Sequence, residues 1–566
     1  MNRRELLGLG VNAAAVVSAG SLWMSEVRAA EPSRYEPLFP LLDRFVEQYL
    51  RDMNAPGLTL ALADANGVQR ICAYGLDNLA LRRPLDVNEL FHIGSITKSF
   101  TGLCLLQLHD EGKLDLHKPI AGYLPWLRFD PATRPLTAHD LLTHAAALPD
   151  GDLFPANPAL RHRATAAPGT FFHYCNMGYQ ALGLLIETLD GRSFGESVRV
   201  RVLKPLGMSA TEPVITLDIL PRLADSYVIA RNDRPYPREG ALAPAPAIVM
   251  TEASGSIASN ARDMGAYLTM LIKRGRANGS RLVSESAFTL FSTGHIAAEE
   301  FGPGARYGYG IAVDTLDGHV RLRHTGGMVS FASALEVDLD AGLGVFVSVN
   351  SMQGYRPRPV AVYALRLMRA CREEAALPVV PPPAPALAVE KAQDYAGQYT
   401  HTDGRPLEVA TEGDRLYLLH AGVRVPLEPA PGVDDGFLVH HPDFAKFPLV
   451  FSRRGSGSTG PVVEAAWGSD WYVTAGYSGP REFSVPAEWH HYTGHYRSED
   501  PWTGSTQIVL RRGKLWVNGT VPLEPAGGTK FWLRDEPQNP EWVSFSDLVN
   551  GHAMRMCASG ANLARV

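Results

Sequence analysis

The feature that most constrains the fold of this chain is a repeat in its last third. Residues 395–399 (Tyr-Ala-Gly-Gln-Tyr) are echoed 97 positions later by residues 492–496 (Tyr-Thr-Gly-His-Tyr), and residues 425–430 return letter for letter as residues 521–526. Both copies combine short strand-like runs with Gly and Pro turns and many aromatic side chains, a pattern typical of small antiparallel barrels or sandwiches. We therefore predict two small antiparallel β-barrel domains, over residues 390–480 and 481–566.

A proline-rich segment separates these repeats from the rest of the chain. Five of the eight residues 378–385 are proline, which favours an extended spacer without packed structure. We expect a linker over residues 377–389 and one larger domain over residues 31–376. Hydrophobic residues make up 45% of the 566 and charged residues 20%, which is ordinary for a soluble globular protein.

The larger domain has strand patterns at both ends and helical patterns between them. A hairpin signal at Asn66-Gly67 joins strand-like residues 58–63 and 69–74, and further strand-like runs follow at 309–314, 331–338 and 343–350. Apolar spacing predicts helices over residues 41–54, 100–111, 179–189, 263–273 and 360–372. The expected fold class is α+β, with helices flanking an antiparallel sheet built from both ends of the domain.

Charge and cysteine content exclude several kinds of partner. The formal net charge is -6 and no long basic run occurs, so we expect no nucleic-acid partner. The five cysteines are scattered, which favours buried thiols over a disulfide framework. The pairs His440-His441 and His490-His491 lack zinc-motif spacing, and we interpret them as solvated loop histidines. We predict no metal and no cofactor, and the oligomeric state stays open.

The first thirty residues have the character of an export signal. Arg3 and Arg4 precede a weakly hydrophobic stretch from Leu6 to Met24, and residues 27–30 suit cleavage beside small side chains. This pattern is similar to a twin-arginine signal. No later stretch approaches the roughly 20 apolar residues that cross a bilayer, so we expect a periplasmic or secreted protein without a membrane span after cleavage.

Ser95 and Lys98 form the first candidate catalytic pair. Gly94 precedes a predicted helix, so Ser95 falls in its first turn, where free N–H groups and the helix dipole stabilise developing negative charge. Lys98 lies three residues on and shares that face. If the face is buried, desolvation lowers the lysine pKa and the neutral amine can accept the serine proton.

Two further segments carry polar groups suited to the same site. Tyr174 and Asn176 stand two apart in a polar segment, so extended backbone would point both the same way. His324, Thr325, Gly326 and Gly327 stand at a strand end, where the glycines would let a substrate backbone approach. Each segment alone also fits an ordinary structural role, and their order along the chain is what singles them out.

In that order the three segments resemble the active-site set of the penicillin-recognising serine hydrolases. The likeness spans about residues 38–372 and is nearest the class C β-lactamases and their DD-peptidase, D-aminopeptidase and esterase relatives. It implies an acylated Ser95, Lys98 as its activating partner and Tyr174 as general base and proton shuttle. It further implies that substrate is held by Asn176, His324, Thr325, Gly326 and Gly327. Whether Lys98 or Tyr174 takes the first proton stays open.

His324 departs from the β-lactamases, which usually carry Lys at this position. A histidine is charged only below about pH 6 to 7 unless its surroundings shift it, so it offers no fixed cation to a substrate carboxylate. This residue and the two C-terminal repeats are more reminiscent of DD-peptidases and D-aminopeptidases. The predicted function is therefore an exported acyl-serine hydrolase of amide or peptide bonds, acting on a small-molecule or peptide substrate with a D-amino acid.

Other functions remain as alternatives. An esterase or a β-lactamase would use the same residues, and a non-catalytic binding or sensor protein could keep the fold. Gly191-Arg192-Ser193-Phe194-Gly195 matches the nucleophile-elbow pattern of α/β-hydrolases, but a helix and no strand precedes it. We therefore expect Ser193 to be a helix N-cap.

Overall fold

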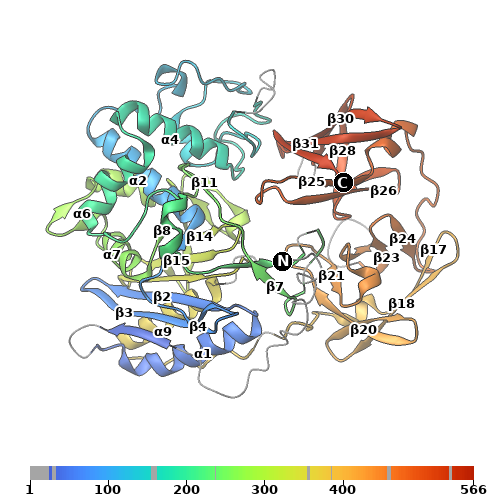
Figure 1. The fold of residues 1–566 in the computed structure, drawn as a ribbon, viewed down its shortest axis with the longest axis horizontal. Coiled ribbons are helices and arrows are strands. Elements are labelled where there is room, and N and C mark those ends of the chain that lie inside the picture. The colour runs from blue at the N-terminus through green and yellow to red at the C-terminus, as the bar shows by residue number, and fades with distance from the viewer. Residues whose placement is uncertain are drawn as a thin grey trace, which may run out of the picture.

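The computed structural model describes residues 24–28, 33–154, 162–231, 233–235, 237–352, 357–383, 385–454, 460–533 and 538–566. One large sheet with helices forms the N-terminal domain, and two closed eight-stranded barrels follow it (Figure 1). The predicted α+β domain followed by two antiparallel β-barrels is thus confirmed. Both barrels lie on the same side of the N-terminal domain.

The N-terminal sheet is antiparallel and takes strands from both ends of the domain. Along its main path the order is β1-β3-β2-β16-β15-β14-β13-β12-β11. Its strands are β1 (Met24–Arg28), β2 (Gly57–Asp64), β3 (Gly67–Asn78), β11 (Ile296–Ala297), β12 (Arg306–Tyr307), β13 (Ala312–Leu316), β14 (His319–Gly327), β15 (Ala332–Asp338) and β16 (Leu343–Val349). The pairing of β2 with β16, from Leu58 opposite Val349 to Asp64 opposite Leu343, joins the two chain ends.

Helices cover both faces of this sheet, and for that reason β2, β15 and β16 bury every residue. One face packs on α1 (Phe39–Asp52) and α9 (Arg358–Arg372) through large side chains such as Leu60. The other face packs on α7 (Ala261–Ile272), where Ala61 lets the helix lie close. Alternate residues of one strand therefore serve two different cores.

The remaining elements of the N-terminal domain build the helical layer beside α7. Its longer helices are α2 (Thr97–Asp110), α4 (Asn176–Asp190) and α8 (Glu285–Ser292), and the shorter ones α3 (Ala138–Leu142), α5 (Phe194–Val198) and α6 (Lys204–Leu206). Short strands are β4 (Arg83–Pro84), β5 (Phe91–His92), β6 (Tyr227–Ile229), β7 (Leu242–Pro244), β8 (Ala258–Ser259), β9 (Arg276–Ala277) and β10 (Ser280–Arg281). Ser193 accepts a hydrogen bond from the Glu196 N–H as N-cap of α5, as expected.

The two barrels repeat one another strand for strand. The first consists of β17 (Gly397–His401), β18 (Pro406–Glu412), β19 (Arg415–His420), β20 (Val423–Pro429), β21 (Gly436–Val439), β22 (Leu449–Arg453), β23 (Val462–Trp467) and β24 (Asp470–Val473). The second consists of β25 (Gly494–Arg497), β26 (Ser505–Arg511), β27 (Lys514–Val517), β28 (Val521–Gly527), β29 (Lys530–Leu533), β30 (Trp542–Val549), β31 (His552–Ala558) and β32 (Ala561–Arg565). The sequence echo has a structural counterpart, because Tyr399 donates to the Tyr395 carbonyl and Tyr496 to the Tyr492 carbonyl.

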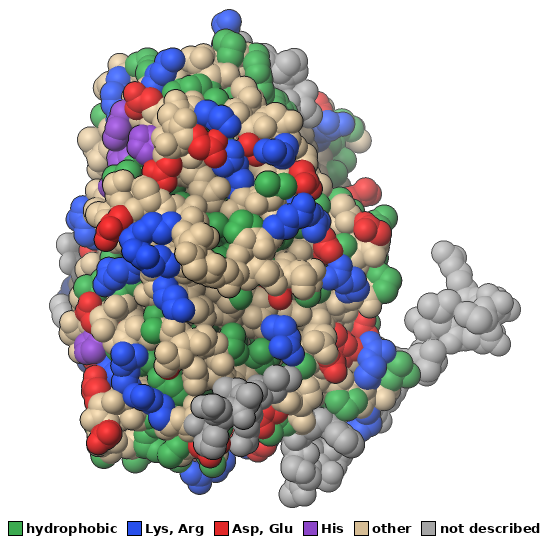
Figure 2. Space-filling view, turned by 90° about the vertical axis from the view of Figure 1, so that its left-hand side faces the viewer, with side chains coloured by type: hydrophobic (Ala, Val, Ile, Leu, Met, Phe, Trp, Pro, Cys, Tyr) green, Lys and Arg blue, Asp and Glu red, His purple; other side chains and the backbone are tan. Residues whose placement is uncertain are grey.

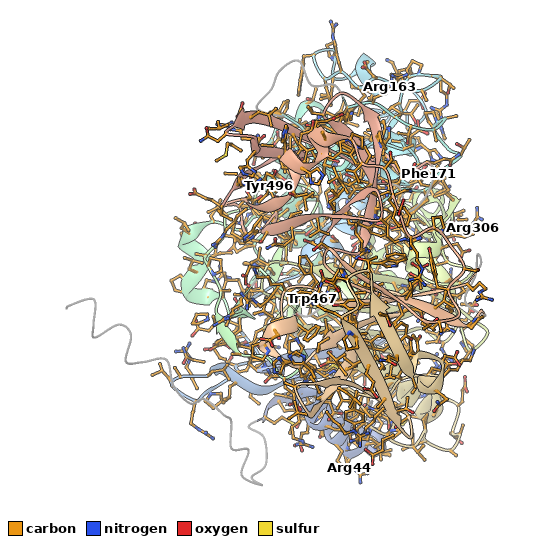
Figure 3. All side chains as sticks on the ribbon, turned by 90° about the vertical axis from the view of Figure 1, so that its right-hand side faces the viewer. Arg44, Arg163, Phe171, Arg306, Trp467 and Tyr496 are labelled. Carbon is orange, nitrogen blue, oxygen red and sulfur yellow. The ribbon has the colours of Figure 1, made fainter. Side chains whose placement is uncertain are left out.

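The barrels are also fastened to each other. Figure 3 views them directly, with Trp467 in the first barrel and Tyr496 in the second. Arg511 of β26 is buried and donates to the carbonyl oxygen of Gly468, in the first barrel, at 2.9 Å. Arg512 forms an ion pair with Glu464 of β23. These contacts join the first barrel to the second.

The predicted export segment lies mostly outside the described residues. Its residues 24–28 form β1, which pairs antiparallel with β3 from Met24 opposite Tyr74 to Arg28 opposite Arg70. In the part of the chain that is described, no helix is both long and apolar enough to cross a bilayer. On the face shown in Figure 2, acidic and basic side chains are interspersed.

Candidate active site

Ser95 lies in a short 3-10 turn, Gly94–Ile96, that leads directly into α2. Gly94 has a positive φ of 52°, and a Cβ there would lie 2.8 Å from the Gly327 carbonyl oxygen. The turn therefore needs glycine both for its backbone conformation and for its contact with β14. Ser95 itself stays partly exposed, whereas its neighbours Gly94 and Ile96 are buried.

Lys98 is fully buried, one turn along from Ser95. Its Nζ lies 3.2 Å from Ser95 Oγ, 2.6 Å from Asn176 Oδ1 and 2.8 Å from the carbonyl oxygen of Ser254. Its ammonium forms no ion pair with a described residue. Burial lowers the pKa of Lys98 to about 7, although the charge of nearby Asp150 opposes that shift.

Tyr174 and Asn176 both face Lys98, as their spacing predicts. The Tyr174 ring centroid lies 4.8 Å from Lys98 Nζ, and the Asn176 side chain accepts the hydrogen bond from that nitrogen. His144 orients the segment between them, because the Cys175 N–H donates to its Nδ1 at 3.0 Å. Ser95, Lys98, Tyr174 and Asn176 thus converge on one point.

Helix α4 starts at Asn176, three residues before the predicted start at Tyr179. Its N-cap residue, Cys175, has no capping side chain, and Asp150 supplies the acceptor instead. Asp150 Oδ1 accepts the N–H of Asn176 at 2.6 Å and of Met177 at 3.2 Å, and Oδ2 accepts from Asn176 Nδ2 at 2.8 Å. A cap from a remote loop leaves no local signal, so the sequence could not reveal it.

Asp150 belongs to a group of carboxylates that the sequence analysis missed. Burial raises its pKa, and the charge of Glu541 in the second barrel raises it further. Burial likewise raises the pKa of Glu252, with a contribution from Asp150. Three carboxylates from separate segments therefore interact, and Asp150 is the one that acts on Lys98. None stands in a motif, and only tertiary structure brings them together.

The second barrel contacts Asp150 and its neighbours directly. Glu541, just before β30, accepts the Asp150 N–H at 2.6 Å, and its Oε1 is hydrogen-bonded to His173 Nε2 at 2.8 Å. Thr165 donates to the Gln538 carbonyl at 2.6 Å. In Figure 3 the neighbouring labels Arg163 and Phe171 mark this part of the N-terminal domain. One end of the second barrel is thus tied to the segment that carries Asp150 and Tyr174.

The strand that carries His324 borders the Ser95 turn. β13 pairs with β14 only as far as Arg323, so from His324 to Gly327 this edge of β14 faces the Ser95 turn, with no strand partner among the described residues. A Cβ at Gly326 would overlap the Ile93 carbonyl oxygen. The glycines therefore let the strand approach the nucleophile turn, a close contact that the sequence analysis assigned to substrate alone.

His324 is buried, with 2% of its surface exposed, whereas Thr325 and Gly327 are partly exposed. Its Nδ1 lies 2.6 Å from the Thr325 carbonyl oxygen, which can only accept, so Nδ1 carries the proton. Its Nε2 then accepts from the Tyr307 hydroxyl at 2.8 Å. Burial and the charge of Lys98 lower the pKa of His324 to about 3. The ring is neutral at physiological pH.

The site combines groups suited to activating a serine hydroxyl. A buried amine contacts the hydroxyl, a phenol and an amide face the amine, and an unpaired strand edge lies alongside. The predicted substrate groups at Thr325 and Gly327 are accessible, and those at His324 and Gly326 are buried. Their roles stay predictions.

Comparison with known proteins identifies similar chains. A family model described as Beta-lactamase matches residues 42–369. Penicillin-binding protein 4* of Bacillus subtilis (strain 168) is 24% identical over 405 residues, which cover 66% of this chain and 86% of that protein. Protein flp of Staphylococcus aureus (strain COL) is 26% identical over 185 residues, 30% of this chain and 37% of that one.

A solved structure is similar over a longer stretch. The octameric penicillin-binding protein homologue from Pyrococcus abyssi superposes with a TM-score of 0.56 and 25% sequence identity. The superposition covers 76% of this chain and 99% of that chain, more of this chain than residues 42–369 alone.

Proposed function

This chain belongs to the beta-lactamase family, and from that premise we propose that it is an exported acyl-serine hydrolase cleaving amide or peptide bonds next to D-amino acids. The family match over residues 42–369 includes every site residue predicted from the sequence, from Ser95 to Gly327. In the proposal Ser95 is the acylated nucleophile, Lys98 its base, and Tyr174 the group that relays the proton.

The hydrogen bonds of Lys98 carry this proposal. A neutral amine has two N–H groups and one lone pair. The oxygens of Asn176 and Ser254 that contact Nζ are both carbonyl oxygens, which can only accept, so they take the two N–H groups. The lone pair is left for the third contact, Ser95 Oγ. With a pKa of about 7, a large share of Lys98 is neutral at physiological pH.

The proposed reaction forms an ester on Ser95 and then hydrolyses it. The Ser95 proton moves to Lys98 Nζ while Oγ bonds to the substrate carbonyl carbon. Backbone N–H groups at Ser95 and at the Gly327 end of β14 stabilise the oxyanion. The proton passes through the Tyr174 phenol to the leaving nitrogen as the C–N bond breaks. Water attacks the resulting ester, gives up its proton by the reverse path, and releases a carboxylic acid and free Ser95.

The charges around the pocket support a substrate with a free amine. His324 is neutral, so it offers no cation to a substrate carboxylate. Asp150 interacts electrostatically with Lys98, and the carboxylates of Glu541 and Glu252 each interact with Asp150. An ammonium group on the substrate would relieve their mutual repulsion, whereas a substrate carboxylate would add to it. This favours an aminopeptidase type of substrate over carboxylated peptides and β-lactams.

Hydrolysis of D-alanine p-nitroanilide and of its L enantiomer, with the Ser95→Ala variant alongside, tests the proposal. We expect p-nitroaniline from the D form and none from the variant. Equal rates for both enantiomers would contradict the stereochemical part, and turnover that survives in Ser95→Ala would contradict the assigned nucleophile. Hydrolysis of only esters or β-lactams would instead establish an esterase or β-lactamase. No hydrolysis of any of these substrates would favour the binding or sensor function.

Export to the periplasm or the medium is part of the proposal and has its own test. Arg3 and Arg4 are the twin arginines of the proposed signal. Replacing both with Lys should leave the protein in the cytoplasm, with the precursor mass retained. Unchanged fractionation of the variant in its bacterial host would contradict export by this route.

A further inference from the structure

We propose that the first barrel binds one divalent cation of the Zn²⁺ class through His420, His441 and Asp443. These residues lie outside the candidate active site, so this proposal goes beyond the proposed function and does not depend on it. It replaces the interpretation of His441 as a solvated loop histidine.

The three side chains come from two neighbouring segments of the barrel. His420 ends β19, while His441 and Asp443 flank Pro442 at the start of a 3-10 turn, Pro442–Phe444. One ligand atom from each residue lies within 4.8 Å of the other two. Two imidazoles and one carboxylate are a donor set suited to zinc and to related transition metals.

The distances fit a tetrahedral centre. His420 Nε2 lies 2.9 Å from Asp443 Oδ2, and His441 Nδ1 lies 3.7 Å from the same oxygen. Zinc holds such atoms at about 2.0 to 2.2 Å, which separates neighbouring ligands by roughly 3.4 Å in a tetrahedron. The two observed distances bracket that value. A cation can therefore enter with small rotations of the side chains.

Neighbouring groups already hold the ligands in place. The Phe444 ring packs edge-on against His420 with centroids 5.1 Å apart, and the two imidazoles pack edge-on at 4.8 Å. His441 Nδ1 accepts the Asp443 N–H at 3.2 Å, which shows that this nitrogen carries a lone pair. A bound cation takes that lone pair, and the N–H turns to solvent.

The site is open on its outer side. The side chains of His420 and His441 are 31% and 28% exposed, and that of Asp443 is 64% exposed. Ions can therefore reach it from solvent, and water completes the coordination of the cation. Three protein ligands and one exchangeable position are typical of open zinc sites.

The barrel fold does not require these residues. At the repeat offsets of 96 and 97, the counterparts of His420 in the second barrel are Trp516 and Val517, neither of which can bind a metal. Both barrels nevertheless close with eight strands. Among the described residues, such a cluster therefore occurs in the first copy alone.

The proposed site also adjoins a cavity between the two domains. His441 and Phe444 line a space of about 340 Å³ together with residues of the N-terminal domain such as Arg231, Arg234 and Gly240. An ion that fixes the turn 442–444 against β19 therefore also fixes one wall of this cavity.

Cobalt titration of the full-length, tag-free protein after chelator treatment tests the proposal. Co²⁺ reports four- or five-coordination by strong visible absorption bands. We expect one equivalent to bind with these bands, and Zn²⁺ to displace it. His420→Ala and Asp443→Asn should each weaken binding roughly a hundredfold or more, because loss of a ligand costs more than loss of a supporting group.

His490→Ala is the matched control, since it removes a histidine from the second barrel and none of the three ligands. It should bind Co²⁺ like the unchanged protein. The proposal is overturned if the unchanged protein binds no stoichiometric Co²⁺, or if His420→Ala keeps the same affinity and spectrum. Circular dichroism of each variant separates loss of ligands from loss of the fold, and neither readout depends on hydrolytic activity.

Discussion

The nitrogen of Lys98 couples the chemistry of the site to pH. Its pKa is about 7, and only the neutral amine can accept the Ser95 proton. As pH falls through that value the amine becomes protonated, so kcat/KM should fall about tenfold per pH unit on the acid side. A pH profile of p-nitroanilide hydrolysis measures this limb. A flat rate between pH 5 and 8 would contradict the role of Lys98 as base.

The charge of Asp150 should set the pH at which kcat/KM begins to fall on the acid side. Asp150→Asn removes the negative charge that raises the Lys98 pKa, so the acid limb should move to lower pH. In the unchanged protein Asp150 Oδ2 accepts a hydrogen bond from Asn176 Nδ2, and the variant can place an amide NH2 group there instead. Loss of this hydrogen bond should lower kcat/KM about tenfold to a hundredfold. The pH profile is the deciding readout, because a purely structural defect would lower the rate without shifting the limb.

At the scale of elements, the contact between β14 and the Ser95 turn can be tested with one methyl group. Gly326→Ala places a Cβ against the Ile93 carbonyl oxygen and must push the strand away from the turn. We expect a loss of about 1 to 3 kcal/mol in unfolding free energy and a larger loss in activity, roughly a hundredfold in kcat/KM.

Gly178→Ala is the matched control. Gly178 lies in α4 near the same pocket, but a Cβ there meets Leu141 at 3.6 Å, an ordinary contact. This variant should keep its activity and stability. Equal activity of the two variants in side-by-side assays would refute the idea that the close approach of β14 matters.

Elements with strong periodicity were predictable from the sequence. The helix over residues 41–54 and the hairpin at Asn66-Gly67 are confirmed as α1 and the β2-β3 turn, because their apolar spacing and turn residues are local. The start of α4 was predicted three residues late because its cap, Asp150, comes from a remote loop. Local patterns identify elements, whereas a boundary set by a tertiary contact has no local signal.

At the scale of the whole molecule, Glu541 should link the second barrel to catalysis. Glu541→Gln weakens its hydrogen bonds to the Asp150 N–H and to His173, both of which end on one carboxylate oxygen. Such bonds contribute about 1.5 to 3 kcal/mol, so kcat/KM should fall at least about tenfold. Steady-state kinetics test this, with the exposed Glu482→Gln as control. Matching kinetics for both variants would show that the barrel does not act on the site.

Contacts between distant parts of the chain limit how much of the site could be predicted from the sequence. Ser95, Lys98, Tyr174 and Asn176 stand in short motifs, and the structure brings them together. Glu541 lies 446 positions after Ser95 in a separate domain, and no spacing rule connects the two. Ser254 contributes only a backbone oxygen, which any residue type could supply.

The loop between the fifth and sixth strands is one contact that both barrels make with the N-terminal domain. In the second barrel this loop brings Glu541 to Asp150, and in the first it brings His441 to the cavity that Arg231 and Gly240 also line. Because the two copies dock through equivalent loops, the sequence of that loop can change in one copy while the rest of the barrel is kept. Evolution, or a protein engineer, could therefore retune selectivity by exchanging one loop while the catalytic residues stay untouched.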